Sequence, residues 1–397
     1  MHIALVTTSF PLTKESASGP FILRLIKHFP ANLVIEVITP CTNKPTTPFL
    51  NYTNISIHCF RYAPWSWQTI AHQPGGVPVA IRQHRWLILL LPFFLFSLFF
   101  NCLKVARKAN IIHAQWSVNG AIAAMAGWFT HTPVITTLRG SDVSRTQHSA
   151  LDRYLLRLCL QLNNYVVSVS ESIHDQITHD YPQFKHKLVT IPNGVEEVFL
   201  NINRQNRAAD NVMRIVSIGN LIASKGMDTI LKAFAKLNVL TKIELYIIGD
   251  GPEKASLESL TRQLEIQQRV VFIGQVNPEQ IPEQLSNADI FVFASQSEGR
   301  PNAVLEAMAS GLPVIASRID GVCEVVQEDI NGLLFDPGNA DELALCLQRL
   351  YINATLRETL GKAAREFIVQ NQLTWQACAR RYVEIYTKLF PKTETPK

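Results

Sequence analysis

The stretch from Ser295 to Ser317 holds the densest set of residues capable of chemistry in this chain of 397 residues. It reads SQSEGRPNAVLEAMASGLPVIAS and contains Glu298, Arg300 and Glu306. The apolar run IFVFAS leads into it, a glycine and a proline break the chain, AVLEAMA favours a helix, and LPVIAS reads as a buried strand. This order predicts a strand, a turn, a helix and a second strand, with both carboxylates near the turn.

The predicted turn would place these side chains at one edge of a sheet. Glu298 lies at the carboxyl end of the first strand, and Glu306 follows eight residues later, about one turn into the helix. In open parallel sheets, ligands bind at this edge, where a helix N-terminus offers free N–H groups and a partial positive charge. We therefore expect a phosphate-bearing ligand at the start of this helix. The alternative is that Glu306 only caps the helix and that Glu298 is solvated.

The same stretch resembles the signature of the retaining glycosyltransferases of family 4. Glu298 and Glu306 match its E-x7-E motif, and EAMASGLPVIA matches its EAMA-x-G-x-PVIA wording almost letter for letter. By this resemblance, Glu298 lies beside the donor sugar and Glu306 accepts hydrogen bonds from the ribose hydroxyls. Backbone N–H groups from Gly299 to Ala303 would hold sugar hydroxyls, and those of Val304 and Leu305 would meet the diphosphate.

A second family motif precedes a helix early in the second half of the chain. Family members usually read G-R-x-x-x-x-K-G there, and this chain reads GNLIASKG. Lys225 matches the lysine that clamps the donor diphosphate, and Asn220 stands where the arginine is usual. Arg300 or Arg139 would supply the missing charge. The resemblance also implies that the backbone from Gly274 to Val276 contacts the nucleobase. Taken alone, a lysine before a helix is an ordinary solvated residue.

The resemblance extends to the first half of the chain. Gly19 lies in the loop before the predicted helix FILRLIKHF, where a family glycine lets the backbone approach the diphosphate; alternatively it is a simple turn residue. The family phrases H-A-x-W and H-G-S-D are matched by His113 with its neighbours and by the run from Arg139 to Asp142. Arg139 replaces the usual histidine, and an arginine there would hold a phosphate or an acidic acceptor. The candidates for the acceptor or sugar side are therefore His113, Arg139 and Asp142. For His113 the alternative is a role in the core.

Strands and helices alternate along the whole chain, which predicts an α/β fold. The length suits two domains of about 200 residues each. The polar run NINRQNRAADN at 201–211 reads as a linker. We expect an acceptor-side, membrane-facing domain at 1–200, a nucleotide-sugar-binding domain at 212–372, and a C-terminal helix at 373–397 that crosses back to the first domain. The resemblance implies two doubly wound Rossmann-like domains that face a cleft, the arrangement called GT-B.

Cysteine and aspartate spacing limit the cofactors and the compartment. The chain has 7 cysteines with no C-x-x-C and no secretory leader, which indicates a reducing, cytoplasmic compartment. It has no D-x-D, the usual carboxylate pair for a divalent ion on a nucleotide diphosphate. We therefore expect no metal and no cofactor besides the nucleotide-sugar substrate.

Positive charge gathers in the first half of the chain. Residues 1–200 carry a net charge of +7 and the remainder −2, and no carboxylate occurs between Glu36 and Asp142. Eight basic residues lie in that interval, and its aromatic residues are embedded in apolar runs instead of alternating with the basic ones. This pattern favours an anionic membrane surface over nucleic acid as a partner.

The most apolar segment is RWLILLLPFFLFSLFFNCL, from Arg85 to Leu103. Its core at 86–100 has 15 residues, is interrupted by Pro92 and is flanked by basic residues, whereas a membrane-spanning helix needs about 20 apolar residues. A buried helix, an interfacial helix and a membrane span all remain open. Upstream, Trp65 and Trp67 suit either a lipid headgroup boundary or a tucked-in loop.

Together these features predict a retaining, metal-independent transferase that moves a sugar from a nucleotide-diphosphate donor to a lipid-linked glycan acceptor in bacterial cell-surface polysaccharide synthesis. It would be peripheral on the cytoplasmic face of the inner membrane. Lys225, Arg300 and the helix N-terminus near Asn302 would stabilise the departing diphosphate, and Glu298 would orient the sugar.

Two other functions use the same scaffold. A nucleotide-sugar isomerase would need further acid and base groups in its site, and the carboxylate-poor first half argues against it. A non-catalytic sugar-nucleotide-binding protein is suggested by Asn220 and Arg139, where the family residues are absent.

Overall fold

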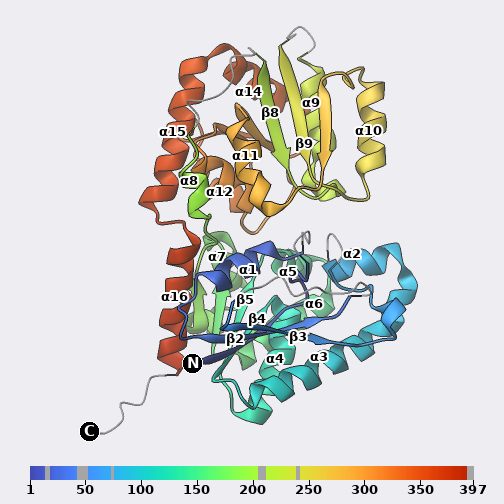
Figure 1. The fold of residues 1–397 in the computed structure, drawn as a ribbon, viewed down its shortest axis with the longest axis vertical. Coiled ribbons are helices and arrows are strands. Elements are labelled where there is room, and N and C mark those ends of the chain that lie inside the picture. The colour runs from blue at the N-terminus through green and yellow to red at the C-terminus, as the bar shows by residue number, and fades with distance from the viewer. Residues whose placement is uncertain (14–17, 43–51, 73–75, 204–211, 238–241, 391–397) are drawn as a thin grey trace. The chain divides into compact units, whose positions relative to one another are not determined.

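The computed structural model describes residues 1–13, 18–42, 52–72, 76–203, 212–237 and 242–390 (Figure 1). It divides into two compact units, the first made of 1–192 together with the segment from Trp375 onward, and the second of 193–374. Each unit is a parallel sheet with helices on both faces. The α/β fold with two Rossmann-like units is therefore confirmed.

Unit 1 contains a sheet of 7 parallel strands in the order β3-β2-β1-β4-β5-β6-β7. The strands are β1 His2–Val6, β2 Val34–Pro40, β3 Ile55–Phe60, β4 Ile111–Gln115, β5 Val134–Leu138, β6 Tyr165–Ser168 and β7 Leu188–Thr190. Side chains alternate between the two faces, so Ile3 and Leu5 of β1 enter one core, while Ala4 and Val6 enter the other. Both faces are covered, which explains why these strands read as continuous apolar runs.

Two sets of helices cover the two faces of this sheet. One face is covered by α1 Pro20–Lys27 and α16 Trp375–Leu389, and the other by α2 Gly76–Gln83, the 3-10 helix η2 Arg85–Leu90, α3 Leu91–Ala106 and α4 Ser117–Thr130 (Figure 1). The remaining helices are η1 Trp65–Trp67, α5 Ser141–Ser144, η3 Arg145–Gln147, α6 Ala150–Leu162, α7 Glu171–Asp180 and η4 Pro182–Lys187. Trp375, Tyr382 and Tyr386 of α16 are fully buried, so the last helix is part of the core of unit 1.

Unit 2 contains a sheet of 6 parallel strands in the order β10-β9-β8-β11-β12-β13. The strands are β8 Met213–Ile218, β9 Ile243–Ile248, β10 Val270–Gly274, β11 Ile290–Phe293, β12 Val314–Ser317 and β13 Leu333–Phe335. The helices are α8 Glu197–Leu200, η6 Ala223–Lys225, α9 Met227–Ala235, α10 Lys254–Gln263, η7 Pro278–Gln280, α11 Ile281–Ser286, α12 Asn302–Ala309, α13 Asp320–Cys323, α14 Ala340–Ile352 and α15 Ala354–Gln370. The predicted strand, turn, helix and strand of the 295–317 stretch are β11, its following turn, α12 and β12.

The strand order reverses beside the first strand of each unit. In unit 2 the chain first builds outward through β8, β9 and β10, and then returns to add β11, β12 and β13 on the other side of β8. The loops after β8 and β11 therefore leave neighbouring strands in opposite directions at the same sheet edge. Crevices at such reversal points are where open α/β sheets bind ligands.

The boundary between the units differs from the expected linker. Unit 2 begins at Asn193, because Val195 and Phe199 are buried in its core and Arg365 donates hydrogen bonds to the carbonyls of Leu200 and Ile202. Residues 193–200 thus belong to the second unit and not to the first. Of the expected linker at 201–211, residues 204–211 lie outside the described residues.

The apolar segment of unit 1 is only half covered. Phe94 and Leu98 are buried against the sheet, whereas Phe93 and Phe96 on the same helix are 64% and 66% exposed. The expectation of a buried helix therefore holds for one side of this segment only. Trp65 and Trp67 are also exposed and not tucked into the loop.

Candidate active site

Lys225 and Glu298 form an ion pair at the point where the strand order of unit 2 reverses. Lys225 ends η6 in the loop after β8, and Glu298 lies in the turn after β11. Lys225 Nζ bonds to Glu298 Oε1, and the Ser295 hydroxyl donates to the same oxygen at 3.2 Å. Both charged side chains are about one-fifth exposed, so a ligand can reach them.

Direct backbone contact holds the lysine loop against the turn. Gly226 has φ of +63°, and a Cβ on it would lie 2.2 Å from the carbonyl oxygen of Ala294. The N–H of Gln296 donates to the Ser224 carbonyl at 2.8 Å, and the Ser295 hydroxyl donates to the same carbonyl at 3.1 Å. Only glycine fits at position 226, and this close approach brings Lys225 to Glu298.

A second glycine supports the turn from the other side. Gly321 of α13 packs so closely that a Cβ on it would lie 2.4 Å from the Glu298 carbonyl oxygen and 2.6 Å from that of Gly299. The Ser317 hydroxyl donates to the Ser295 carbonyl at 2.5 Å. The backbone that carries Glu298 is thus held by β12 and α13 before any ligand arrives.

The N-terminus of α12 faces this turn without a side-chain cap. Pro301 is the N-cap residue, and the first intrahelical bond runs from the N–H of Leu305 to the Pro301 carbonyl at 3.2 Å. The N–H of Leu305 is therefore already used within the helix, and the donors at the helix start are those of Asn302, Ala303 and Val304. Glu306, the fifth residue of α12, is buried at 6% exposure.

Arg300 is held by a carboxylate. Its Nη1 lies 3.2 Å from Glu324 Oε2, and both side chains are largely buried. Asn220, where the family arginine is usual, is exposed, and its carbonyl accepts from the N–H of Ile222 at 2.9 Å. Arg300 was expected to supply the positive charge of that missing arginine. The negative charge of Glu324 offsets this positive charge.

The loops after β8, β9 and β10 meet beside Asn220. Gly249 has φ of +144°, and a Cβ on it would lie 1.9 Å from the Gly219 carbonyl oxygen. Its N–H donates to the Gly274 carbonyl at 2.9 Å. Gly274 has φ of +81° with open space on its Cβ side, and Val276 two residues on is half-buried. The backbone predicted to contact the nucleobase thus lies at the same sheet edge as Lys225.

In unit 1, His113 is fully buried and serves the core. Its Nδ1 bonds to the hydroxyl of Tyr386 at 2.7 Å, and its Nε2 to the hydroxyl of Thr137 at 2.8 Å. Burial, together with the smaller effect of the Arg139 charge, lowers the pKa of the imidazole from 6.5 to about 3. His113 is therefore neutral and has the core role that the sequence left as an alternative to direct sugar contact.

Asp142 is also fully buried and organises the loops after β4 and β5. Its carboxylate accepts the N–H of Ser117 and the N–H of Arg139, each at 3.0 Å. Burial raises the pKa of the carboxyl, and these two donors oppose that rise. Asp142 fixes the backbone at the start of α4 and at Arg139.

Arg139 is partly exposed, whereas the other two candidates of unit 1, His113 and Asp142, are fully buried. Its Nε and Nη2 donate to Gln115 Oε1 at 2.9 and 2.6 Å, and the guanidinium lies 4.5 Å from the ring centroid of Phe21. Gly19 is the N-cap residue of α1, two residues before Phe21, and has φ of +63°. A Cβ on Gly19 would lie 2.3 Å from the Ser9 carbonyl oxygen, so the close turn requires glycine. Gly19 and Arg139 thus lie at the strand-order reversal of unit 1.

The structure adds residues that the motifs did not single out. Glu298 is positioned by Ser295, Gly226 and Gly321. Arg139 is positioned by Gln115, and His113 by Tyr386. Gly226 is the last residue of the GNLIASKG phrase, next to Lys225. Tyr386 lies 273 residues from His113, and no local pattern links them.

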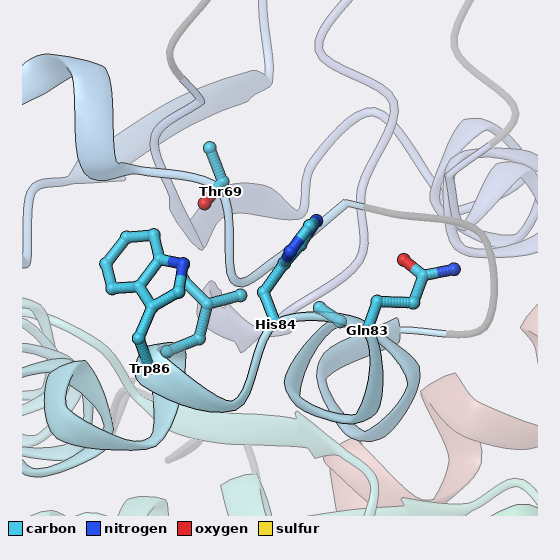
Figure 2. A pocket seen from close by; sticks show the side chains of 6 residues that line it. Thr69, Gln83, His84 and Trp86 are labelled. Atoms are coloured by element: carbon cyan, nitrogen blue, oxygen red, sulfur yellow. The ribbon is translucent and has the colours of Figure 1, made fainter.

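The cavity that the structure describes lies in unit 1, away from the motif region. Among the described residues, no group of three or more His, Cys, Asp or Glu side chains is placed to hold a metal ion. A cavity of about 310 Å³ lies in unit 1, between the loop at Thr69, helix α2 and η2. Figure 2 shows Trp86, His84 and Thr69 around it. It shares no residue with the site at Glu298.

Two family models match the chain in succession. The model described as Glycosyltransferase Family 4 matches residues 21–198, and the model described as Glycosyl transferases group 1 matches residues 199–367. The second match contains Lys225, Glu298 and Glu306.

Individual relatives agree with these models. The chain is 27% identical over 296 residues to N-acetyl-alpha-D-glucosaminyl L-malate synthase of Bacillus anthracis, which covers 71% of this chain and 76% of the relative. It is 27% identical over 324 residues to alpha-monoglucosyldiacylglycerol synthase of Streptococcus pneumoniae, covering 73% of each. The crystal structure of Anabaena HepE in complex with UDP and glucose has the same fold, with a TM-score of 0.74 at 18% identity over 97% of this chain and 99% of that one. The chain therefore belongs to the family 4 glycosyltransferases of GT-B fold.

Proposed function

We propose that this glycosyltransferase binds a nucleotide-diphosphate sugar on unit 2 and transfers the sugar with retention of its anomeric configuration, without a metal ion. The ion pair of Lys225 and Glu298, beside the uncapped start of α12, carries the proposal. The family assignment favours transfer over isomerisation and over a purely binding role.

The pair supplies one group for each part of the donor. Lys225 would leave Glu298 for the phosphate oxygens, and the first N–H groups of α12 would point at the same anion. Glu298 would then hold a sugar hydroxyl and offset positive charge at the anomeric carbon. As the bond from that carbon to the phosphate oxygen breaks, donors already in place stabilise the negative charge on the diphosphate.

Transfer is completed by the acceptor. Its hydroxyl oxygen forms the new bond to the anomeric carbon on the face that the diphosphate leaves, and its proton passes to the departing phosphate oxygen. Because the leaving group takes this proton, the step needs no separate protein base.

We further propose that the acceptor is a lipid-linked glycan of a bacterial cell-surface polysaccharide and that the enzyme is peripheral on the cytoplasmic face of the membrane. Support comes from the excess of basic residues in the first half of the chain and from the exposed apolar side of α3. A relative named for a glycosyldiacylglycerol product fits the same chemistry.

Protection against heat by UDP-, GDP- and ADP-sugars, measured with EDTA present, tests the donor site. We expect protection by one nucleotide series, lost in Lys225→Ala and Glu306→Ala. Lys232→Ala is the matched control, because Lys232 is an exposed lysine of α9 paired with Asp228. Protection that appears only after a divalent ion is added, or that survives in Lys225→Ala, contradicts the proposal. The configuration of the product, read by NMR, tests retention.

A further inference from the structure

An exposed apolar surface covers one side of unit 1. It is formed by η1, η2, the outer side of α3 and the C-terminal end of α4, and we call it the aromatic face. Among its exposed side chains are Trp86, Leu89, Phe93, Phe96, Trp128 and Phe129, of which Trp128 is 72% exposed. A surface of this extent marks an interaction site, because isolated soluble proteins rarely expose so many large apolar groups together.

The parts of the aromatic face touch one another. The ring centroids of Trp67 and Trp86 are 6.0 Å apart and join η1 to η2. Those of Phe99 and Phe129 are 6.1 Å apart and join α3 to α4. Segments from three parts of the sequence therefore form one surface, and α4 belongs to it although it lies outside the long apolar run.

The opposite side of α3 anchors the helix to the domain. Phe94, Leu98 and Cys102 are buried in the core next to the sheet. By length and composition, Arg85–Ala106 is long and apolar enough to cross a membrane, being 22 residues. To span the bilayer, however, it would have to withdraw these side chains from the core. Moreover, α3 itself has 16 residues, or about 24 Å against a hydrocarbon core of about 30 Å.

Positive charge surrounds the aromatic face. Arg82 and Arg85 precede α3, and Lys104, Arg107 and Lys108 lie at its end, all exposed. The Arg61 guanidinium lies over the ring of Trp65, 5.9 Å from its centroid. No carboxylate occurs in the sequence between Glu36 and Asp142 to offset these charges. Apolar aromatic side chains bordered by basic ones match the acyl boundary and the headgroups of an anionic membrane.

We infer that the aromatic face docks unit 1 on an anionic lipid surface, with α3 lying in the plane of the membrane and the side chains of Phe93, Phe96 and Trp128 in the headgroup and acyl boundary. This inference rests on the proposed function, because a lipid-linked acceptor explains why the enzyme would hold this surface against a membrane. A second copy of the chain is the rival occupant of the face.

Co-sedimentation of the full chain with vesicles tests the inference. We expect binding to equimolar phosphatidylglycerol and phosphatidylcholine, and little to phosphatidylcholine alone. The variant Phe93→Ser, Phe96→Ser, Phe100→Ser should weaken binding more than about tenfold. The variant Lys104→Ser, Arg107→Ser, Lys108→Ser should weaken it by about fivefold for each charge removed. Trp128→Ser alone should also weaken binding, because α4 belongs to the surface.

Matched controls come from elsewhere in the chain. Ile330→Ser, Ile352→Ser, Val369→Ser removes three exposed apolar side chains of unit 2, and Arg380→Ser, Arg381→Ser, Lys388→Ser removes three basic residues of α16. Both control variants should bind vesicles as the wild type does. The inference is overturned if the aromatic triple variant binds anionic vesicles as fully as the wild type does. It is also overturned if the wild-type protein does not bind anionic vesicles. A dimer that dissociates in the aromatic variant and does not bind vesicles assigns the face to a second copy instead.

Two further measurements complete the test: the depth of the tryptophan side chains in the membrane, and donor binding by the surface variants. Lipids brominated near the headgroup should quench the tryptophan fluorescence more than lipids brominated near the chain ends, and the reverse order overturns the in-plane placement. Heat protection by the donor nucleotide, measured on the same preparations, should be unchanged in the surface variants. Lost vesicle binding with retained donor protection therefore separates failure of the surface from failure of the donor site.

Discussion

Lys225 and Glu298 lie 73 residues apart in the chain and share an ion pair because they follow neighbouring strands, β8 and β11, at the same edge of the sheet. Each side chain neutralises the other while no donor is bound. In the proposed mechanism donor binding separates the pair, so substitution of Lys225 and substitution of Glu298 should have different effects.

Glu298→Gln should lower the rate of sugar transfer by about 10²- to 10³-fold, the usual loss when a preorganised electrostatic group is removed. Its amide still accepts from Ser295, so the turn should remain in place and nucleotide protection should be retained. Lys225→Ala should lose both transfer and protection. Initial rates and thermal shifts measure the two effects, and a Glu298→Gln enzyme with full activity would rule out a role for that carboxylate at the reaction centre.

Gly226→Ala should destabilise unit 2 by about 2–4 kcal/mol, because the alanine is strained at positive φ and its methyl group meets a backbone carbonyl. Gly338→Ala is the matched control: Gly338 has φ of +80° but nothing within 4 Å of the added carbon. It should cost only about 1 kcal/mol. Urea unfolding measures the difference, and equal costs would show that the loop does not press on Ala294.

Stability should fall in acid partly through His113. Its pKa is about 3 in the folded chain, against about 6.5 when unfolded, so between these values the unfolded state binds more protons. Its contribution is complete above pH 6.5 and is lost as the pH falls towards 3, by up to about 1.4 kcal/mol for each pH unit. His113→Gln should have a shallower decline in unfolding free energy between pH 6.5 and 5, whatever its stability at pH 7.

The matched control for that experiment is His131→Gln, since His131 is exposed on the same unit. It should leave the slope unchanged. Some slope should also persist in His113→Gln, because burial lowers the pKa of His72 as well. A wild-type slope in the His113 variant would mean that this imidazole is protonated without unfolding the core.

Tyr386→Phe should destabilise unit 1 by about 1–3 kcal/mol, because it leaves the buried His113 Nδ1 without its hydrogen-bond partner. Tyr154→Phe removes the hydroxyl of an exposed tyrosine of α6 and should be neutral. Thermal unfolding compares the two. Equal stability would show that the link between α16 and β4 contributes nothing to the fold.

The sequence alone identified the elements and the family, since both are local properties. Strand, turn and helix at 295–317 follow from apolar periodicity and chain breakers within one short span, and the spacing of Glu298 and Glu306 on that unit carries the family signature. Lys225 was found in the same way, from a motif of eight residues.

Tertiary structure decided which residues meet and which sides stay exposed. His113 is a core residue because α16 packs against β4 and brings the Tyr386 hydroxyl to it. The charge of Arg300 is offset because the chain folds Glu324 against it. Apolar residues occupy most of the circumference of α3, so its pattern could not say which side the sheet would cover. Only packing against β1, β2 and β3 buried Phe94 and left Phe93 exposed.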